Sequence, residues 1–304
     1  MRVSLIHNPK AGNKGPSKKK LIKMLRRAGY DPVYHSTKKS DWDSFIRDPG
    51  EFAIIAGGDG TIRKVATRVI GQNVPIALLP LGTANNISKS LGVYGSPEAV
   101  IGRWAESRRK KFDAGLITTP WGDARFLEGV GIGLFSKAMS ILDITDDKKQ
   151  HEFSSSKDKL YRDISALMVL ASEISPFELR VTLDGEDISG RFLLVEAMNT
   201  NFVGPNLRLA VGADPGDGQL DLVSVTEDER EKLEAYLANC LCGKESASDI
   251  SIRRGRHLQI YLDRDEFHVD DKIWPGSEDY SSAASNGPVL IDIKLQPGAL
   301  EMLV

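Results

Sequence analysis

Cysteine is nearly absent from this sequence, which excludes a fold held together by disulfide bonds. The 304 residues include two cysteines, Cys240 and Cys242, which lie two positions apart. On the helix that we expect there, side chains at positions i and i+2 do not face each other. The spacing therefore argues against a disulfide and against a pair of metal ligands, and we expect both thiols to lie in the core.

Long apolar runs are also missing, so the sequence contains no candidate for a membrane-spanning helix. Its longest apolar stretches have the length of a strand, whereas a spanning helix needs about 20 apolar residues. Residues 1–6 lead directly into a predicted strand, without the apolar region of a secretory signal. We therefore expect a cytoplasmic protein.

The sequence lacks a strong excess of either charge. It has 40 basic and 42 acidic residues, for a formal net charge of −2, which gives no electrostatic reason to expect a nucleic acid partner. Basic residues nevertheless crowd the predicted helix 17–28 and the run 108–111. Two explanations stay open, a solvated helix face and a patch that contacts anionic lipid, where each basic residue contributes about 1 kcal/mol.

The most informative segment that is present is Ala-Ile-Ile-Ala-Gly-Gly-Asp-Gly-Thr at 53–61, an apolar strand ending in a glycine turn. Glycine allows positive φ or a close approach of the backbone to a phosphate. Residues 62–70 have apolar side chains at helical spacing, and the N-terminal end of that helix faces the same turn. Asp59 would repel a bare phosphate, so it indicates either an intervening metal ion or a hydroxyl to be activated.

A second loop of the same design follows the next predicted strand. Strand 74–79 leads into Leu-Gly-Thr-Ala-Asn-Asn at 81–86 and then into a short predicted helix, 87–91. One glycine turn alone is more typical of a tight connection between a strand and a helix. Two such turns at the carboxyl ends of neighbouring parallel strands predict a nucleotide site, because ligands bind there in α/β sheets.

The predicted elements divide the chain into two domains. Up to residue 112, strands alternate with helices, which indicates βαβ units and a parallel sheet. We predict an α/β nucleotide-binding domain at 1–112 and a β-rich antiparallel domain at 113–304, whose extreme C-terminus packs back on the first. A loop is expected at 143–158 between two helices. Strands of the second domain are expected at 125–129, 177–183, 190–197, 207–211, 220–225, 250–252, 257–262, 266–269 and 289–295.

Three motifs together resemble the diacylglycerol kinase catalytic family, specifically its soluble bacterial lipid kinases. They are Asn-Pro-Lys-Ala-Gly at 8–12, the glycine loop at 57–61, and Leu-Pro-Leu-Gly-Thr-Ala-Asn at 79–85. The glycine loop alone also occurs in NAD kinases and some phosphofructokinases, whereas the other two motifs point to lipid kinases. The resemblance implies ATP bound in the cleft between the domains. The implied nucleotide contacts are Asn8, Thr37, Gly57, Gly58, Asp59, Gly60, Thr61, Ile62, Arg63, Gly82, Thr83 and Asn85.

The resemblance extends into the second domain. The runs 199–204 and 213–221 match a signature of the family, whose members hold a divalent ion there through a carboxylate and backbone carbonyls. The match implies Mg²⁺ at Asp214, Asp217 and Gln219. Oxygen ligands on a tight loop suit Mg²⁺, and the same composition is also that of an ordinary surface turn.

The position of the catalytic base departs from the family pattern. Relatives carry Asp-Gly-Glu near the end of the second domain, and this sequence has Asp270, Asp271 and Lys272 there. A charged lysine cannot accept a proton. The resemblance therefore implies that Asp270 or Asp271 removes the proton of the lipid hydroxyl, with Asp59 as the next candidate, or that the activity is lost.

Three classes of function stay open. Asn86 stands where relatives usually carry Asp, which neutralises part of the carboxylate network, whereas Asp113 keeps the acidic residue of the family at the domain junction. The main expectation is an ATP- and Mg²⁺-dependent lipid kinase acting on a diacylglycerol-like hydroxyl. A non-catalytic nucleotide or lipid sensor and a soluble-substrate kinase of the NAD kinase type are the alternatives.

The expected partner is a lipid substrate at a membrane surface. We also expect peripheral contact of the protein with the inner face of the membrane. The sequence leaves open whether the protein forms a homodimer. The sequence does not identify the lipid, because diacylglycerol, ceramide, sphingoid bases, phosphatidylglycerol and polyprenol present similar hydroxyls.

Overall fold

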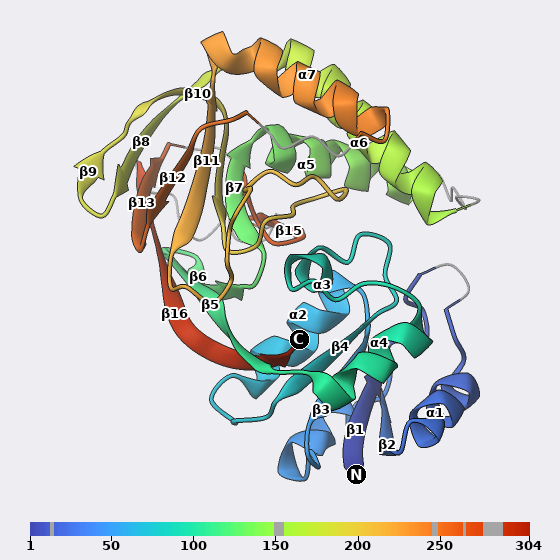
Figure 1. Ribbon diagram of the computed structural model, residues 1–304. Coiled ribbons are helices and arrows are strands. Elements are labelled where there is room, and N and C mark those ends of the chain that lie inside the picture. The colour runs from blue at the N-terminus through green and yellow to red at the C-terminus, as the bar shows by residue number, and fades with distance from the viewer. Residues whose placement is uncertain (13–14, 149–154, 245–248, 264–265, 276–287) are drawn as a thin grey trace. The chain divides into compact units, whose positions relative to one another are not determined.

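The computed structural model describes all residues except 13–14, 149–154, 245–248, 264–265 and 276–287 (Figure 1). The chain forms two compact units. Unit 1 comprises residues 1–113 and 297–304, and unit 2 comprises residues 114–296. Unit 1 changes to unit 2 between residues 113 and 114, next to the predicted boundary at 112–113. This position lies inside a strand, β5 (Arg109–Thr119), that the sequence analysis did not predict.

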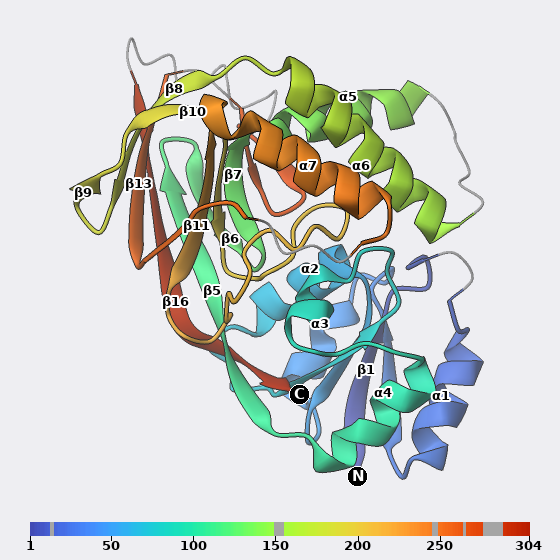
Figure 2. The same ribbon diagram turned by 45° about the horizontal axis from the view of Figure 1, so that its top comes forward.

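Unit 1 consists of parallel strands connected by helices, as predicted. Its elements are β1 (Arg2–His7), α1 (Lys18–Arg27), β2 (Asp31–Ser36), η1 (Trp42–Arg47), β3 (Ala53–Gly57), α2 (Asp59–Val69), β4 (Ile76–Pro80), α3 (Asn86–Ser90), α4 (Pro97–Arg103), η2 (Trp104–Glu106) and the last residues of β16 (Val289–Leu303). The strand order is β4-β3-β1-β2, with the four strands labelled in Figure 1 and β1 seen from a second direction in Figure 2. β16 adds to this sheet in parallel, where Met302 pairs with Ile76.

Apolar runs of the sequence become the buried strands of this sheet. Every residue of β3 is buried. Helix α1 buries Leu21, Met24 and Leu25 while its lysines are exposed, and Ser17 caps it by accepting the N–H of Lys20 at 3.4 Å. Local patterns of apolar residues therefore account for this unit. None of the helices among the described residues combines the length and the apolarity that crossing a membrane requires.

Unit 2 is rich in antiparallel strands, as predicted, and carries three longer helices. Its strands pair in the order β15-β14-β7-β10-β8-β13-β16, with β11 and β12 extending from β10. The elements are β6 (Gly122–Phe126), β7 (Gly129–Gly133), α5 (Leu134–Lys148), α6 (Ser156–Glu173), β8 (Phe177–Leu183), β9 (Glu186–Asp187), β10 (Gly190–Met198), β11 (Leu220–Thr226), η3 (Glu227–Glu229), α7 (Arg230–Leu241), β12 (Ile252–Gly255), β13 (His257–Leu262), β14 (Phe267–Val269) and β15 (Lys272–Trp274).

Apolar side chains of unit 2 form two clusters. One lies where α5, α6 and α7 cover β10 and β11, and it includes Leu167 and Leu237. The other is enclosed by strands and includes Leu222 and Phe267. β10 contributes to both clusters and is buried along most of its length, so a charged side chain on this strand needs a partner inside the protein.

One predicted strand of unit 2 is a loop. Residues 207–211 contain alternating apolar side chains, which favoured a strand. Leu207 and Leu209 are fully buried in the helix-covered cluster, and an isolated bridge joins Leu207 to Val203. The alternation therefore reflects burial of a loop, and the strand prediction is wrong.

Two further expectations need correction. The segment 143–158 was expected to be a loop, but α5 continues to Lys148 and α6 begins at Ser156; residues 149–154 lie outside the described residues. Both cysteines were expected in the core. Cys242 is exposed at the end of α7, and Cys240 packs against the helix-covered cluster.

Candidate nucleotide site and associated loops

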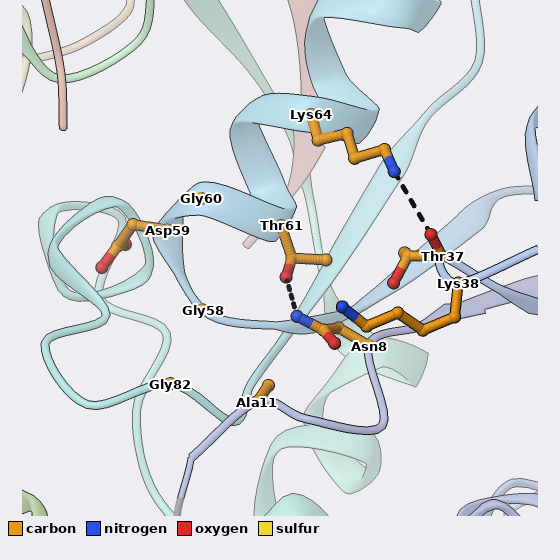
Figure 3. Close-up of a pocket in the computed structure, with 10 residues that line it drawn as sticks. All are labelled: Asn8, Ala11, Thr37, Lys38, Gly58, Asp59, Gly60, Thr61, Lys64 and Gly82. Atoms are coloured by element: carbon orange, nitrogen blue, oxygen red, sulfur yellow. Dashed lines mark hydrogen bonds between the residues drawn. The ribbon is translucent and has the colours of Figure 1, made fainter. Parts of the chain in front are cut away.

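A pocket of about 310 Å³ lies at the carboxyl ends of the parallel strands of unit 1 (Figure 3). Asn8 follows β1, Thr37 follows β2, Gly58 follows β3, and Gly82 lies just beyond β4. Neighbouring strands therefore each contribute a residue, as expected for a ligand site in an open α/β sheet. The lining residues are Asn8, Ala11, Thr37, Lys38, Gly58, Asp59, Gly60, Thr61, Lys64 and Gly82.

The two glycine loops touch through their backbones. The N–H of Leu81 donates to the carbonyl oxygen of Gly57 at 2.9 Å. A Cβ atom on Gly58 would lie 2.9 Å from Cα of Gly82, and a Cβ atom on Gly82 would lie 2.5 Å from Cα of Gly58. The φ angle of Gly58 is −98°. Glycine is therefore required here for close approach of two backbones and not for positive φ.

Asp59 bridges the two loops. It is the first residue of α2, and its Oδ1 accepts the N–H of Ile87, at the start of α3, at 3.1 Å. Burial raises the pKa of Asp59 above its ordinary value, and hydrogen bonds from the N–H groups of Ile87 and Asn86 act in the opposite direction. Figure 3 shows the carboxylate turned away from Asn8 and Thr61. This carboxylate therefore holds the loops together.

Asn85 shapes the second loop around Gly82. Its backbone has a φ of 56°, in the left-handed region that asparagine tolerates better than most residues. Its Oδ1 accepts the N–H of Gly82, and its Nδ2 donates to the carbonyl oxygen of Gly82, both at 2.9 Å. Asn85 thus positions Gly82, which itself lines the pocket.

The first motif and the glycine motif meet inside the pocket. Nδ2 of Asn8 donates to Oγ1 of Thr61 at 3.0 Å, as the dashed line in Figure 3 shows. Oδ1 of the same asparagine accepts the N–H of Lys10. Because α2 begins at Asp59, the positive end of its dipole also faces the pocket. The surroundings suit an anionic group.

Two lysines in the pocket lining were missed by the sequence analysis. Nζ of Lys64 donates to the carbonyl oxygen of Thr37 at 3.2 Å and lies 4.8 Å from the centre of the Trp42 ring. Lys38 lines the pocket beside it (Figure 3). A signal was available, since Lys38 directly follows Thr37 and Lys64 lies one helical turn beyond the glycine motif. Ala11, inside the first motif, was also missed as a lining residue.

If this pocket binds ATP, as the resemblance implies, replacing Lys64 with Met should weaken that binding without preventing folding. Lys64 is exposed, so its attraction to phosphate is screened, and we expect the Kd for ATP to rise about two- to fivefold. Isothermal titration calorimetry at low salt would measure this change. Lys23→Met on the exposed face of α1 is the control, and an equal effect in both variants would contradict a local contact.

Other predicted nucleotide contacts lie outside the pocket lining. Ile62 is fully buried in the apolar core of unit 1, where its side chain supports α2. Among the described residues, the pocket lining also leaves out Gly57, Arg63, Thr83 and Asn85. Asn85 and Gly57 nevertheless contact the loops that form it. The direct roles of these residues stay predictions.

The predicted metal ligands lie on one tight loop of unit 2. The N–H of Gly216 donates to Oδ1 of Asp214 at 3.1 Å, and the N–H of Gln219 donates to Oδ1 of Asp217 at 2.9 Å. Asp217 is exposed, and Asp214 and Gln219 are partly buried. No cluster of three His, Cys, Asp or Glu side chains that could hold a metal ion occurs in the part of the chain described.

Asp221 adds negative charge beside this loop. It is 1% exposed, and Arg254 donates to its Oδ1 at 2.9 Å. Its Oδ2 is buried without a hydrogen-bond partner. Burial raises the pKa of Asp221, Arg254 lowers it, and the nearby charges of Asp217 and Asp214 raise it again. A buried carboxylate oxygen beside two more carboxylates is an arrangement that a hard cation would stabilise.

Asp270 and Asp271 form the two-residue turn between β14 and β15. Val269 pairs with Lys272 at the base of this hairpin, and Asp270 has a φ of 52°. The Asp270 carboxylate is buried, while Asp271 and Lys272 are exposed. The two candidate bases therefore lie in different environments, which their adjacency in the sequence did not reveal.

The Asp270 carboxylate accepts three backbone N–H groups. Oδ1 accepts from Glu128 at 2.8 Å and from Gly129 at 3.2 Å, and Oδ2 accepts from Leu127 at 3.1 Å. The N–H of Asp270 donates to the carbonyl oxygen of Gly129 at 2.9 Å. Asp270 thus attaches the hairpin turn to the chain that enters β7.

Asp113 has a structural contact in unit 1. It is fully buried, and its Oδ1 accepts the N–H of Gly298 at 2.6 Å. Since Asp113 lies on β5 and Gly298 on β16, this hydrogen bond ties the strand that leaves unit 1 to the strand that returns to it. This hydrogen bond gives the buried carboxylate of Asp113 a structural role.

The fold and the pocket define a class of proteins in which a glycine-loop α/β unit is combined with a β-rich unit. Residues 2–117 match the model of the diacylglycerol kinase catalytic domain, and residues 143–304 match that of the YegS C-terminal NAD kinase beta sandwich-like domain. The chain therefore belongs to the lipid kinase family that carries these two domains, whose members are phosphotransferases.

Individual relatives agree with this assignment. The chain is 24% identical over 257 residues to a diacylglycerol kinase of Mycobacterium tuberculosis, covering 82% of this chain and 75% of that protein. It is 34% identical over 105 residues to the lipid kinase YegS of Escherichia coli, covering 32% of this chain and 34% of that protein. A crystal structure of a diacylglycerol kinase from Bacillus anthracis shares the fold, with a TM-score of 0.70, 20% identity, and coverage of 99% and 96% of the two chains.

Proposed function

We propose that this protein is an ATP- and Mg²⁺-dependent lipid kinase that transfers the γ-phosphoryl group to the hydroxyl of a diacylglycerol-like lipid. The observation that carries the proposal is the pocket at the strand ends of unit 1. There the bare backbone of Gly58 and Gly82, the start of α2, and the side chains of Lys38 and Lys64 surround one space. Backbone N–H groups at a helix N-terminus together with ammonium groups match the charge of a triphosphate.

The reaction also requires a group that accepts the hydroxyl proton. As the lipid oxygen bonds to the γ-phosphorus, the bond to the β-phosphate oxygen breaks, ADP leaves, and the hydroxyl proton goes to a carboxylate. Asp270 is buried and Asp59 is partly buried, whereas Asp271 is exposed, where an incoming lipid hydroxyl can reach it. We assign the proton acceptor to Asp271, with Asp270 holding the turn that carries it.

Mg²⁺ is assigned to the acidic loop of unit 2. The oxygens of Asp214, Asp217 and Gln219 are hard donors, and the unpartnered Oδ2 of Asp221 shows that the loop concentrates negative charge. When bound, Mg²⁺ supplies positive charge that neutralises these carboxylates. The residues themselves order the loop through the N–H contacts of Asp214 and Asp217.

Asp217→Ala should reduce the stabilisation of the protein by Mg²⁺. An ion that binds only the folded state at 100 times its Kd raises the free energy of unfolding by about 2.7 kcal/mol, so the melting temperature of the parent should rise with Mg²⁺ and fall with chelator. The variant should respond less. Thermal melts over a Mg²⁺ series would measure the difference.

Asp187→Ala is a matched control for this experiment. Asp187 accepts the N–H of Ser189 at 2.9 Å, as Asp217 accepts that of Gln219, so both variants lose the same local hydrogen bond. The control should keep the Mg²⁺ response of the parent. If Asp217→Ala keeps it as well, no ion binds at the acidic loop.

Labelled ATP and a panel of acceptors test the proposed function directly. Diacylglycerol, ceramide, a sphingoid base, phosphatidylglycerol and a polyprenol would be presented in mixed micelles, with NAD as a soluble acceptor. We expect transfer to a lipid hydroxyl and none to NAD.

A non-catalytic nucleotide sensor is the second candidate function. Lys272 favours it, because this residue places a cation next to Asp271. ATP binding without transfer to any acceptor would support the sensor and overturn the kinase.

A further inference from the structure

Glu196, Gly131 and His268 lie side by side on three neighbouring strands. Glu196 on β10 is opposite Gly131 on β7, and Gly131 is opposite His268 on β14. A Cβ atom on Gly131 would lie 1.8 Å from Oε1 of Glu196. The missing side chain on the middle strand therefore lets the Glu196 carboxylate cross β7 and reach the ring of His268. Its Oε1 and Oε2 lie 2.8 Å and 3.1 Å from Nε2.

The contacts of His268 suit a charged pair. Nδ1 lies 2.9 Å from the carbonyl oxygen of Asp270, which can only accept a hydrogen bond. Nε2 faces the Glu196 carboxylate. Beside an ionised Glu196, a neutral ring with one N–H could not donate to both partners. Glu196 is 0% exposed and His268 is 2% exposed, so an imidazolium paired with a carboxylate keeps the net charge of this buried site at zero.

The pair is connected to the turn that carries Asp271. His268 holds the carbonyl oxygen of Asp270, while the N–H and the carboxylate of Asp270 hold residues 127–129. At the other end of β14, Phe267 pairs with Trp274 across the hairpin, with ring centres 6.4 Å apart. Both ends of the short hairpin are therefore fixed, and the buried pair acts at the end that presents Asp271.

We propose that Glu196 and His268 are positioning residues, an imidazolium–carboxylate pair that fixes the Asp270 carbonyl and thereby the placement of Asp271. Catalysis by Asp271 rests on the proposed function, whereas the charge state of the pair does not. A misplacement of about 1 Å in a reacting group costs roughly 100-fold in rate. Glu196 and His268 themselves are buried and act through the turn.

The pair has a defined response to pH. Burial acts to lower the pKa of His268, but the charge and hydrogen bond of Glu196, with a smaller contribution from Asp270, raise it above 6.5 overall. The charged groups that face the ring are Glu196 and Asp270. Because the folded pKa is raised, the stability from this pair is fully present below pH 6.5 and is lost as the pH rises through the folded value.

Glu196→Gln and His268→Gln test the positioning role with isosteric or near-isosteric changes. We expect each to lower kcat for lipid phosphorylation about 100-fold with an unchanged KM for ATP. In Glu196→Gln the alkaline limb of the kcat–pH profile should also move to lower pH, because His268 loses the charge that keeps it protonated. His257→Gln is the control, since His257 pairs with Asp292 at 2.6 Å in a partly exposed position. A folded Glu196→Gln variant with parental kcat and pH profile would overturn the proposal.

A second measurement needs no activity and no variant that might fail to fold. Nitrogen-15 NMR of the ring should show both nitrogens of His268 protonated in the parent at pH 6.5, the ordinary pKa of the side chain. A neutral His268 ring at that pH would overturn the proposal. If the parent transfers phosphate to no lipid, the proposed function fails, and a doubly protonated ring together with an alkaline loss of stability would still support the pair.

Discussion

Asp271→Asn is expected to lower kcat for lipid phosphorylation by about 10²- to 10⁴-fold while the Kd for ATP stays unchanged. An amide of the same shape cannot accept the hydroxyl proton, so the substitution should lower kcat and leave ATP binding unchanged. Because Asp271 is exposed, we expect no folding defect to mask the result, since surface changes usually alter stability by about 0.5 kcal/mol or less. Initial rates with labelled ATP and calorimetric ATP binding would separate the two effects.

Asp270→Asn separates the proton acceptor from the residue that holds the turn. Asn tolerates the φ of 52° at this position but removes the charge that accepts three N–H groups. Asp184→Asn is the matched control, because Asp184 has a φ of 51° and also accepts backbone N–H groups, from Arg256 and His257. Both variants should lose stability, and only Asp270→Asn should lose rate.

Three outcomes would contradict or redirect this assignment. A parental rate in Asp271→Asn with a loss confined to Asp270→Asn would move the proton acceptor to Asp270. Parental rates in both variants, singly and combined, would remove the turn from the chemistry and leave Asp59 as the next candidate. An inactive parent that gains activity on Lys272→Glu would show that the lysine disables the site.

Gly58→Val is the second change with a large expected effect. A Cβ atom at this position meets backbone at 2.9 Å, where no side chain can move aside. The glycine loops would separate, and overpacking of this kind costs about 1–3 kcal/mol. If this free energy must be spent to bring the loops into the geometry that binds ATP, the Kd for ATP should rise about 10- to 100-fold. Calorimetry would measure this change.

Gly102→Val provides the comparison for Gly58→Val. A Cβ atom on Gly102, in α4, meets nothing within 4 Å, so this substitution introduces the same side chain without a clash. The control should bind ATP like the parent. ATP binding by Gly58→Val at parental affinity would show that the contact between the two glycine loops is not part of the nucleotide site.

The two glycine loops could be predicted because their signals are local. An apolar run that ends in glycine, followed by helical spacing, defines strand, turn and helix within a short segment, and parallel pairing then brings Gly58 and Gly82 together. The reason for glycine became clear only in the structure. A sequence motif does not distinguish a positive φ from a close approach of two backbones.

Strand β7 shows where local signals fail. Its sequence, Gly-Val-Gly-Ile-Gly, has poor strand propensity, and the strand predicted at 125–129 ends at its first residue. The structure places Gly131 between Glu196 and His268, where a side chain would displace the carboxylate. Glycine at position 131 weakens the local preference for a strand, but it leaves the space through which the Glu196 carboxylate reaches His268.

The sequence by itself determined the two-part organisation, the parallel sheet of unit 1, the glycine loops and the acidic turn, because each depends on the order of neighbouring residues. Tertiary structure decided which charged groups meet. Glu196 and His268 are 72 residues apart in the chain, and the environments of Asp270 and Asp271 differ although they are adjacent. Burial and hydrogen-bond partners depend on elements distant in sequence, so the residue types alone could not separate a carboxylate that holds a turn from one that is exposed.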